Sequence, residues 1–459
     1  MKRFLIILLI FRSCIVFGQS TNDILNVLIA NKTITQQQAD SLRADYAIAQ
    51  QNNQPEKRFQ VEFEFRPRTE FRNGYQQLRN DTTVGTFLTN QRSRLSMNYS
   101  YENRFILQFS AQDLRVWGQQ DPRSTSATIQ AFEAWAEIYL TDKLSVRVGR
   151  QKLVYDNQRL FAENDWRLSG AVHDALNFRY YNKKIAAELA FAANQTAERY
   201  FGTDYSPKDF SSYKYLIVSY IKYSMTDKLA LTLINSTDGF QAKTNPEKTY
   251  FRYTMGGRIE LINGPLYGTI SGYYQGGRNP SGKDLSSYYF QPEVRFSSST
   301  GYTFRLGLEY FSGTNQSGTV LTDNSFVPLY GVAHRFNGSM DLIVKFPNDV
   351  GGAGLINPYF FAVKSLSKKI DIRADFHTFS LQKDYYLNEQ KIKSYLGFEN
   401  DFLVSFKPNP IIKIDAGFSY MLPTKSMEII KGSGNSKHDL YWAYLSLTFR
   451  PVLFTTKFK

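Results

Sequence analysis

Arginine recurs at alternate positions in several segments of this chain, together with acidic and amide side chains. In residues 58–72 all eight even positions are polar, and five of the seven odd positions are large and apolar. A guanidinium group can donate two parallel hydrogen bonds to one carboxylate, which an ammonium group cannot do. These residue types therefore indicate that the protein binds anions rather than that it catalyses a reaction.

Alternation places one set of arginines on the polar face of the expected strands. They are Arg66, Arg68, Arg92, Arg94, Arg147, Arg179, Arg252, Arg258, Arg295, Arg305 and Arg373. Acidic residues share this face, so each arginine either pairs across neighbouring strands or stays unpaired in a path for an anionic solute. Glu399 and Asp401 lie on the same face, and we expect them to pair with wall Arg or Lys. Basic residues on loops could instead bind acidic lipopolysaccharide.

Two further clusters lie outside the regular alternation. Residues 147–174 contain Arg150, Arg159, Asp165, Trp166 and Asp174. The two arginines are either cations of a constriction or structural partners of Asp165 or Asp174, and Trp166 either stacks on a sugar ring or packs at a rim. The second cluster contains His334, Arg335, Asn337 and Asp341. It lies in a long loop that either gates an opening or fills it.

Other chemistries find little support in the sequence. The chain has one Cys and four His, which excludes a disulfide framework and a Cys-based zinc site. We expect no metal, no cofactor and no enzyme activity, because the histidines are scattered and no GxGxxG, P-loop or HExxH motif is present. The net charge is +14, but the positive residues follow strand alternation and form no patch, so we expect no nucleic-acid partner.

The elements that carry these residues have a period of two. Residues 250–261, 302–310 and 370–376 repeat the alternation of residues 58–72. A strand with one face in lipid and one in water has this pattern, and aromatic residues reach 15% beside 21% charged residues. Beyond the N-terminus we find no apolar run of 18 residues. The sequence therefore predicts an all-β fold, a transmembrane antiparallel β-barrel, preceded by a short helical segment.

The connections give the strand count. Eight short turns alternate with nine longer polar loops, among them 153–170, 238–248, 277–286 and 313–354, which predicts about 18 strands. Residues 58–72 should pair with residues 440–450 to close the barrel. Residues 335–346 also alternate, but counting them would break the parity, so we assign them to loop 313–354. An even count leaves both termini in the periplasm.

The N-terminal region has a different character. Residues 1–18 read as a signal peptide, and residues 19–57 as a periplasmic helical hairpin and linker, before the barrel of residues 58–459. The barrel should lie in the outer membrane of a Gram-negative bacterium, among its lipid and lipopolysaccharide. The aromatic-rich residues 440–458 suit a last strand inserted by the barrel assembly machinery.

Three motifs resemble the alginate export family of outer-membrane β-barrel proteins. The first is Gly149-Arg150-Gln151 with Arg159-Leu160, Asp165-Trp166 and Asp174. The others are His334-Arg335-Phe336-Asn337-Gly338 with Asp341, and Gly397-Phe398-Glu399-Asn400-Asp401. The resemblance spans most of residues 58–459, and it implies an 18-stranded barrel that passes an anionic uronate polysaccharide through an Arg-rich constriction.

We therefore expect passive, charge-selective transport of a uronate-type polysaccharide or oligosaccharide through an Arg-lined lumen. The alternative is a general porin or a porin selective for another solute. The expected partner is the anionic polysaccharide or another small anionic solute. A barrel enzyme or a surface adhesin is a third possibility. Conductance and ion selectivity in a planar bilayer would separate the channels from the rest.

Overall fold

The computed structural model describes residues 56–120, 128–205, 212–243, 245–316 and 321–458. The expected signal peptide and helical hairpin lie outside these residues. The main sheet contains 20 segments, of which β14 is a two-residue strand in a loop and β21 and β22 are two parts of the last wall strand. The described chain thus forms a wall of 18 strands, the number predicted. No helix in the described ranges is long and apolar enough to cross a membrane.

The wall strands follow one another in chain order, each antiparallel to the next. They are β1 (Lys57–Asn73), β2 (Thr86–Tyr101), β3 (Phe105–Val116), β4 (Ile129–Tyr139), β5 (Leu144–Gln151), β6 (His173–Tyr181), β7 (Ile185–Ala193), β8 (Tyr215–Ser224), β9 (Leu229–Ala242), β10 (Asn245–Asn263), β11 (Leu266–Arg278), β12 (Asp284–Ser297), β13 (Tyr302–Phe311), β15 (Leu355–Ser367), β16 (Ile370–Leu381), β19 (Tyr395–Asn409), β20 (Ile412–Pro423), β21 (Leu440–Phe449) and β22 (Val452–Phe458).

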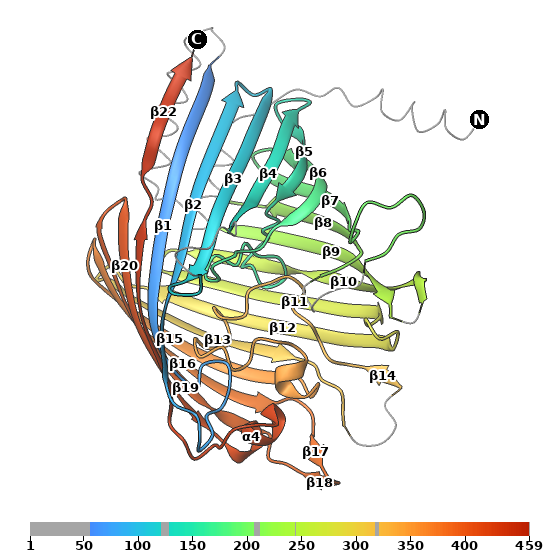
Figure 1. Ribbon diagram of the computed structural model, residues 1–459, viewed down its shortest axis with the longest axis vertical. Coiled ribbons are helices and arrows are strands. Elements are labelled where there is room, and N and C mark those ends of the chain that lie inside the picture. Colours follow the sequence, from blue (N-terminus) through green and yellow to red (C-terminus); the bar gives the residue numbers. More distant parts are fainter. Residues whose placement is uncertain (1–55, 121–127, 206–211, 244, 317–320, 459) are drawn as a thin grey trace.

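The first and last strands close the barrel, as predicted. Thr69 of β1 is opposite Leu445 of β21, and Lys57 is opposite Phe458 of β22. Figure 1 shows β1 and β22 side by side. The last strand is interrupted between Phe449 and Val452, where Pro451 has no N–H to donate to a ladder.

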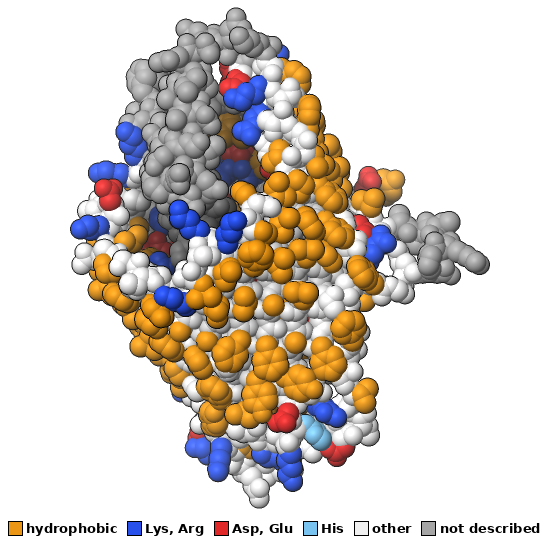
Figure 2. All heavy atoms as spheres, turned by 90° about the vertical axis from the view of Figure 1, so that its left-hand side faces the viewer, with side chains coloured by type: hydrophobic (Ala, Val, Ile, Leu, Met, Phe, Trp, Pro, Cys, Tyr) orange, Lys and Arg blue, Asp and Glu red, His pale blue; other side chains and the backbone are white. Residues whose placement is uncertain are grey.

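The two faces of the wall differ as the alternation predicts. On β1 the side chains of Glu64, Arg66, Arg68 and Glu70 are buried inside the barrel, whereas Phe71 points outward and is exposed. Exposed apolar side chains cover the outer surface, and in Figure 2 they form an orange band bordered by basic side chains at both ends. A lipid-facing wall of a membrane barrel has this composition.

The connections lie at the predicted positions, with differences in length and content. The predicted loops 238–248 and 277–286 are shorter, because β9 continues to Ala242 and β12 begins at Asp284. The loop before β21 contains a helix that the sequence analysis missed, α4 (Lys425–Lys431), capped by Thr424. The other loops contain the 3-10 helix η1 (Asn348–Val350) and the short strands β14 (Thr322–Asp323), β17 (Tyr386–Leu387) and β18 (Gln390–Lys391).

Two long loops fold into the barrel and supply much of its core. We call them the first inner loop, residues 152–172, and the second inner loop, residues 324–354. Phe161 of the first and Phe346 of the second are fully buried, in one cluster with the wall residue Phe311. Figure 1 shows both loops crossing the interior. Residues 335–346 belong to the second inner loop and are not a wall strand, as predicted.

Candidate functional site

Two large cavities lie inside the barrel and share three of the side chains that line them. A cavity of about 830 Å³ is lined by Tyr75 and Gln76 near the long-loop end. A second cavity of about 1000 Å³ reaches the short turns at Lys368. Both are lined by Arg68, Trp166 and His334. We call these the loop-end cavity, the turn-end cavity and the constriction.

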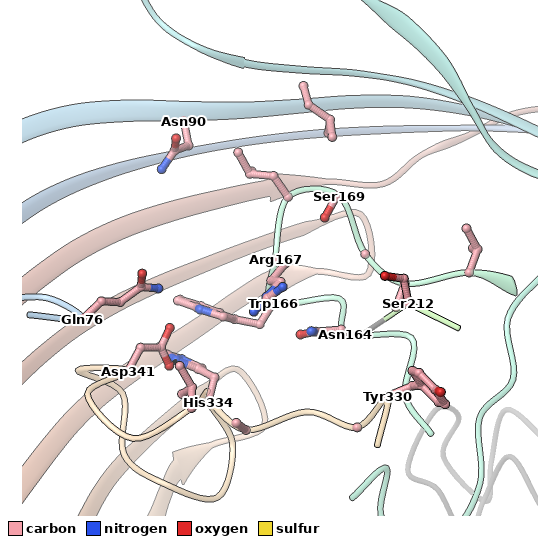
Figure 3. Close-up of a pocket in the computed structure, with 18 of the residues that line it drawn as sticks. Gln76, Asn90, Asn164, Trp166, Arg167, Ser169, Ser212, Tyr330, His334 and Asp341 are labelled. Carbon is pink, nitrogen blue, oxygen red and sulfur yellow. Dashed lines mark hydrogen bonds and ion pairs between the residues drawn. The ribbon is translucent and has the colours of Figure 1, made fainter. Parts of the chain in front are cut away.

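Aromatic stacking joins the two inner loops at the constriction. The rings of Trp166 and His334 stack with centroids 4.2 Å apart and an interplanar angle of 5°. The guanidinium carbon of Arg68 lies 4.1 Å from the centre of the Trp166 ring. Figure 3 shows Trp166 above His334 and Asp341 in the loop-end cavity. Trp166 lies inside the lumen, against a loop residue, so packing at the rim is wrong, and stacking on a sugar stays a prediction.

A hydrogen-bonded chain holds the His334 ring. Its Nδ1 lies 2.7 Å from Oδ1 of Asp341, and the Tyr75 hydroxyl donates to the other carboxylate oxygen. Burial would raise the pKa of Asp341, but His334 and the Tyr75 hydroxyl outweigh burial and lower it. The carboxylate therefore fixes the position of the imidazole ring between the two cavities.

Arginines of β1 and β2 hold the first inner loop against the wall. Arg66 and Arg92 bind the carboxylate of Asp165, with N–O distances of 3.3 and 2.7 Å. Arg68 donates to the carbonyl oxygen of Trp166 at 3.0 Å. Burial would raise the pKa of Asp165, but the charges of Arg66 and Arg92 outweigh burial and hold it well below its usual range. These guanidinium groups are therefore largely occupied by the protein itself.

The remaining strand arginines also lie on the inner side of the wall, and most have partners. Arg147 and Arg179 share Glu137, at 2.6 and 2.9 Å, and Arg258 binds Glu260 at 3.0 Å. Further partners are Asp238 for Arg252, Asp375 for Arg373, Gln112 for Arg94, Glu293 for Arg305 at 3.6 Å, and the ring of Tyr267 for Arg295. Pairing, one of the two alternatives left open by the sequence, is thus common, although Arg258 and Arg373 pair with acidic residues of their own strands.

Arg159 is a buried clamp between the two inner loops. Its guanidinium donates to the carbonyl oxygen of Val332 at 2.7 Å, to Glu309 at 2.9 Å and to Asn337 at 3.2 Å. The side chains of Arg159 and Glu309 are both fully buried. Arg159 is therefore placed away from the two cavities. Its partners are Glu309, Asn337 and a backbone carbonyl, and not Asp165 or Asp174.

Arg150 does pair with Asp174, one of the two predicted partners. Nε and an Nη atom of Arg150 donate to the two carboxylate oxygens at 2.9 and 2.8 Å. The neighbours Gln151 and His173 are buried inside the barrel, so alternation places this pair on the outer side of the wall. The hypothesis that Arg150 lines the constriction is therefore not supported by its position.

We expect Arg150→Ala to lower the free energy of unfolding by less than about 1 kcal/mol, because the pair lies at the long-loop end of β5, where about half of each side chain is exposed, and exposed ion pairs contribute little. Block of the ion current by an anionic solute should stay at the wild-type level. Thermal unfolding and bilayer recordings would check both. If the solute no longer blocks the current while the free energy of unfolding is unchanged, Arg150 contacts the solute.

Glu399 and Asp401 bind the second inner loop, which the sequence did not predict. Both side chains are buried, and they accept hydrogen bonds from the backbone N–H groups of Met340 at 2.7 Å and Ser339 at 3.2 Å. The expected pairing with a wall Arg or Lys is wrong for both residues in the described chain. The loop supplies backbone donors instead, and a Cβ at Gly338 would overlap the Glu399 carboxylate.

The turn-end cavity has a strong excess of positive charge. Four acidic residues line it, Asp165, Asp375, Asp401 and Asp415, against nine basic residues. The basic residues are Arg66, Arg68, Arg335, Lys368, Lys369, Arg373, Lys407, Lys413 and Arg450. The four lysines were not predicted, because the alternation was used to place strand arginines only, although Lys368-Lys369 stands out within a predicted turn.

Arg335 is the arginine of the second inner loop that points into this cavity. Among the described residues its guanidinium makes no ion pair, and it lies near the Phe336 ring at 5.6 Å. Enclosure by the protein lowers its pKa to about 10, with a further contribution from Arg305, so it is cationic at neutral pH. An unpaired cation in a water-filled cavity attracts anions.

In the described ranges no group of three or more His, Cys, Asp and Glu side chains could hold a metal ion. No protein-family model matches this chain, and no curated protein matches it. The resemblance to the alginate export family therefore remains a prediction.

Several solved structures are similar in fold. OccAB1 of Acinetobacter baumannii is 11% identical, with a TM-score of 0.59, over 86% of this chain and 97% of that one. The outer membrane protein OpdK of Pseudomonas aeruginosa is 10% identical, with a TM-score of 0.57, over 87% and 99%. A second OpdK structure, with vanillate, has a TM-score of 0.55 at 10% identity, over 86% and 99%. The chain thus has the fold of an outer-membrane β-barrel.

Proposed function

We propose that this protein is an outer-membrane channel that passes small anionic solutes passively between the loop-end and turn-end cavities. The observation that carries this proposal is the excess of basic side chains around the turn-end cavity, which meets the loop-end cavity at Arg68, Trp166 and His334. Fixed positive charge along a narrow path raises the local concentration of anions. The short turns and both termini would face the periplasm.

The size of the solute follows from the inner loops. Both are anchored inside the lumen, and the stack of Trp166 on His334 lies where the cavities meet. A uronate polysaccharide would also suit the basic cavity, but a polymer must thread past this stack. We therefore favour a small carboxylate over the polymer. The similar OpdK structure that contains vanillate supports an aromatic monocarboxylate as a first test solute.

Transport fits the described side chains better than catalysis does. His173 and His377 are buried, and their Nδ1 atoms lie beside Tyr213 and Asn357. His334 is bonded to Asp341, and His438 lies beside Asp81 at the surface. A hydrolase would need a nucleophile beside such a base, and these partners are a phenol, an amide and two carboxylates.

Reconstitution in a planar bilayer tests the proposal. Under a salt gradient the reversal potential should show preference for anions. Vanillate should block the current reversibly, and a long oligouronate should block without crossing, as measured by its absence from the far chamber. Cation preference, or no conductance, would reject the channel proposed here. Passage of the oligouronate to the far chamber would favour a uronate polysaccharide as the transported solute.

A further inference from the structure

Five exposed lysines in the short turns have amino groups without an ion-pair partner among the described residues. We call them the turn-end lysines, and they lie in the connections β6–β7, β8–β9 and β15–β16. They are Lys183, Lys184, Lys228, Lys368 and Lys369. Lys368 and Lys369 also border the turn-end cavity, whereas the other three border neither cavity.

The acidic residues of this end do not neutralise these lysines. Glu56 binds Lys457 at 2.6 Å, Glu102 binds Arg104 at 3.2 Å, and Asp415 binds Lys413 at 2.7 Å. Asp371 accepts a hydrogen bond from Ser365 at 2.6 Å. Asp142, beside Lys143, and Asp227, beside Lys228, are exposed and in no described ion pair. The turn end therefore keeps a net positive charge.

The turn-end lysines lie beside the apolar band of the outer wall. Tyr223 is an outward-facing, exposed residue one position from the end of β8, and it is opposite Ile185, which follows Lys184. At the β12–β13 turn, the amino group of Lys364 lies 3.7 Å from the centre of the exposed Tyr302 ring. Tyr and Lys meet in this way where the hydrocarbon layer ends and lipid headgroups begin.

We propose that the turn-end lysines bind the phosphate groups of anionic phospholipids in the leaflet at the short-turn end. The proposal rests on the membrane placement given under the proposed function. The lysines form two arcs, on wall strands far apart around the barrel. A lipid leaflet surrounds the barrel and reaches both arcs, whereas a single acidic protein would cover one side. Exposed lysines near a charged membrane surface add to its attraction for the protein.

The proposal also revises the idea that basic loops bind lipopolysaccharide. Cations of the long-loop end are often paired: Arg115 with Asp113 and Arg199 with Asp204, both at 2.7 Å, and Lys431 with Asp349 at 2.8 Å. Unpaired lysines also occur there, namely Lys243, Lys283 and Lys383. They provide a matched control, with the same residue type and charge at the opposite end.

The experiment measures lipid retained by the full-length protein in native mass spectrometry after detergent exchange. Phosphatidylglycerol and phosphatidylcholine are added at equal concentration. Lys183→Gln, Lys184→Gln and Lys228→Gln in one chain should lower phosphatidylglycerol retention severalfold and leave phosphatidylcholine unchanged. The control Lys243→Gln, Lys283→Gln and Lys383→Gln should retain the wild-type amount. Conductance of both variants should stay normal, because these residues lie off the solute path.

Three results would overturn the proposal. Equal losses in both variants would mean that total charge alone matters. Unchanged phosphatidylglycerol with reduced lipopolysaccharide retention would place the lysines in the other leaflet. Unchanged phosphatidylglycerol with reduced binding of polyglutamate would indicate an acidic protein partner. Lipid retention is read separately from conductance, so a failed channel proposal would not decide this test.

Discussion

Arg159→Ala is expected to release the two inner loops from each other and to open the lumen. The change removes three hydrogen bonds and leaves the carboxylate of Glu309 fully buried without its cation. Breaking a buried ion pair from one side costs about 3–5 kcal/mol. Single-channel conductance should rise, and trypsin should cut the inner loops of a barrel that remains folded. Both are compared with wild type at one temperature.

A double variant separates loss of the clamp from general misfolding. Arg159→Met with Glu309→Gln removes both charges, so the buried carboxylate is no longer stranded and much of the stability should return. Arg199→Ala is the matched control, since its ion pair with Asp204 lies at the surface and should matter little. Wild-type conductance and protease resistance in Arg159→Ala would show that apolar packing alone holds the loops.

Reversing the charge of Arg335, Lys368 and Lys369 together to Glu should turn the channel from anion-preferring to cation-preferring. All three line the turn-end cavity, and none forms an ion pair in the described chain. In water, one unit charge about 4 Å from a carboxylate changes its energy by about 1 kcal/mol, about fivefold in local concentration. The reversal potential under a salt gradient measures the change, and vanillate block should weaken with it.

The control for this experiment has the same charge change at the same end. Lys183, Lys184 and Lys228 changed to Glu lie away from the turn-end cavity, so the reversal potential should move much less. If the cavity variant keeps its preference for anions, selectivity comes from the paired arginines of the wall. If the reversal potential shifts equally in both variants, the total charge of the short-turn end determines the ion selectivity.

The barrel itself could be predicted from local sequence. In β1 the side chains alternate between lipid and lumen, and a period of two is a property of the strand backbone that needs no tertiary information. Turn parity then gave 18 strands and the pairing of β1 with β21. The same parity excluded residues 335–346 from the wall. Helix α4 was missed because seven residues give too short a periodic pattern within a polar loop.

The partner of each arginine could not be predicted in the same way. Alternation correctly placed Arg66, Arg92 and Arg373 inside, but whether a cation is free depends on which groups face it. Arg66 and Arg92 bind Asp165, which lies 99 and 73 residues away and reaches them only because the first inner loop folds inward. Arg150 stands in the same motif as Arg159 and Asp165, yet it lies on the outer side of the wall.

The sequence by itself determined the features that depend on residues close together in the chain. These are the alternation, the number of strands and the placement of the strand arginines in the lumen. Tertiary structure decided which charges remain available. The guanidinium group of Arg159 is hydrogen-bonded to Glu309 and Asn337. Arg335, two residues before Asn337, forms no ion pair in the described chain and lines the turn-end cavity. In sequence, Arg159 is separated from Glu309 by 150 positions and from Asn337 by 178. These contacts form because two loops pack against each other inside a closed barrel. A local sequence pattern cannot predict contacts between residues so far apart in the chain.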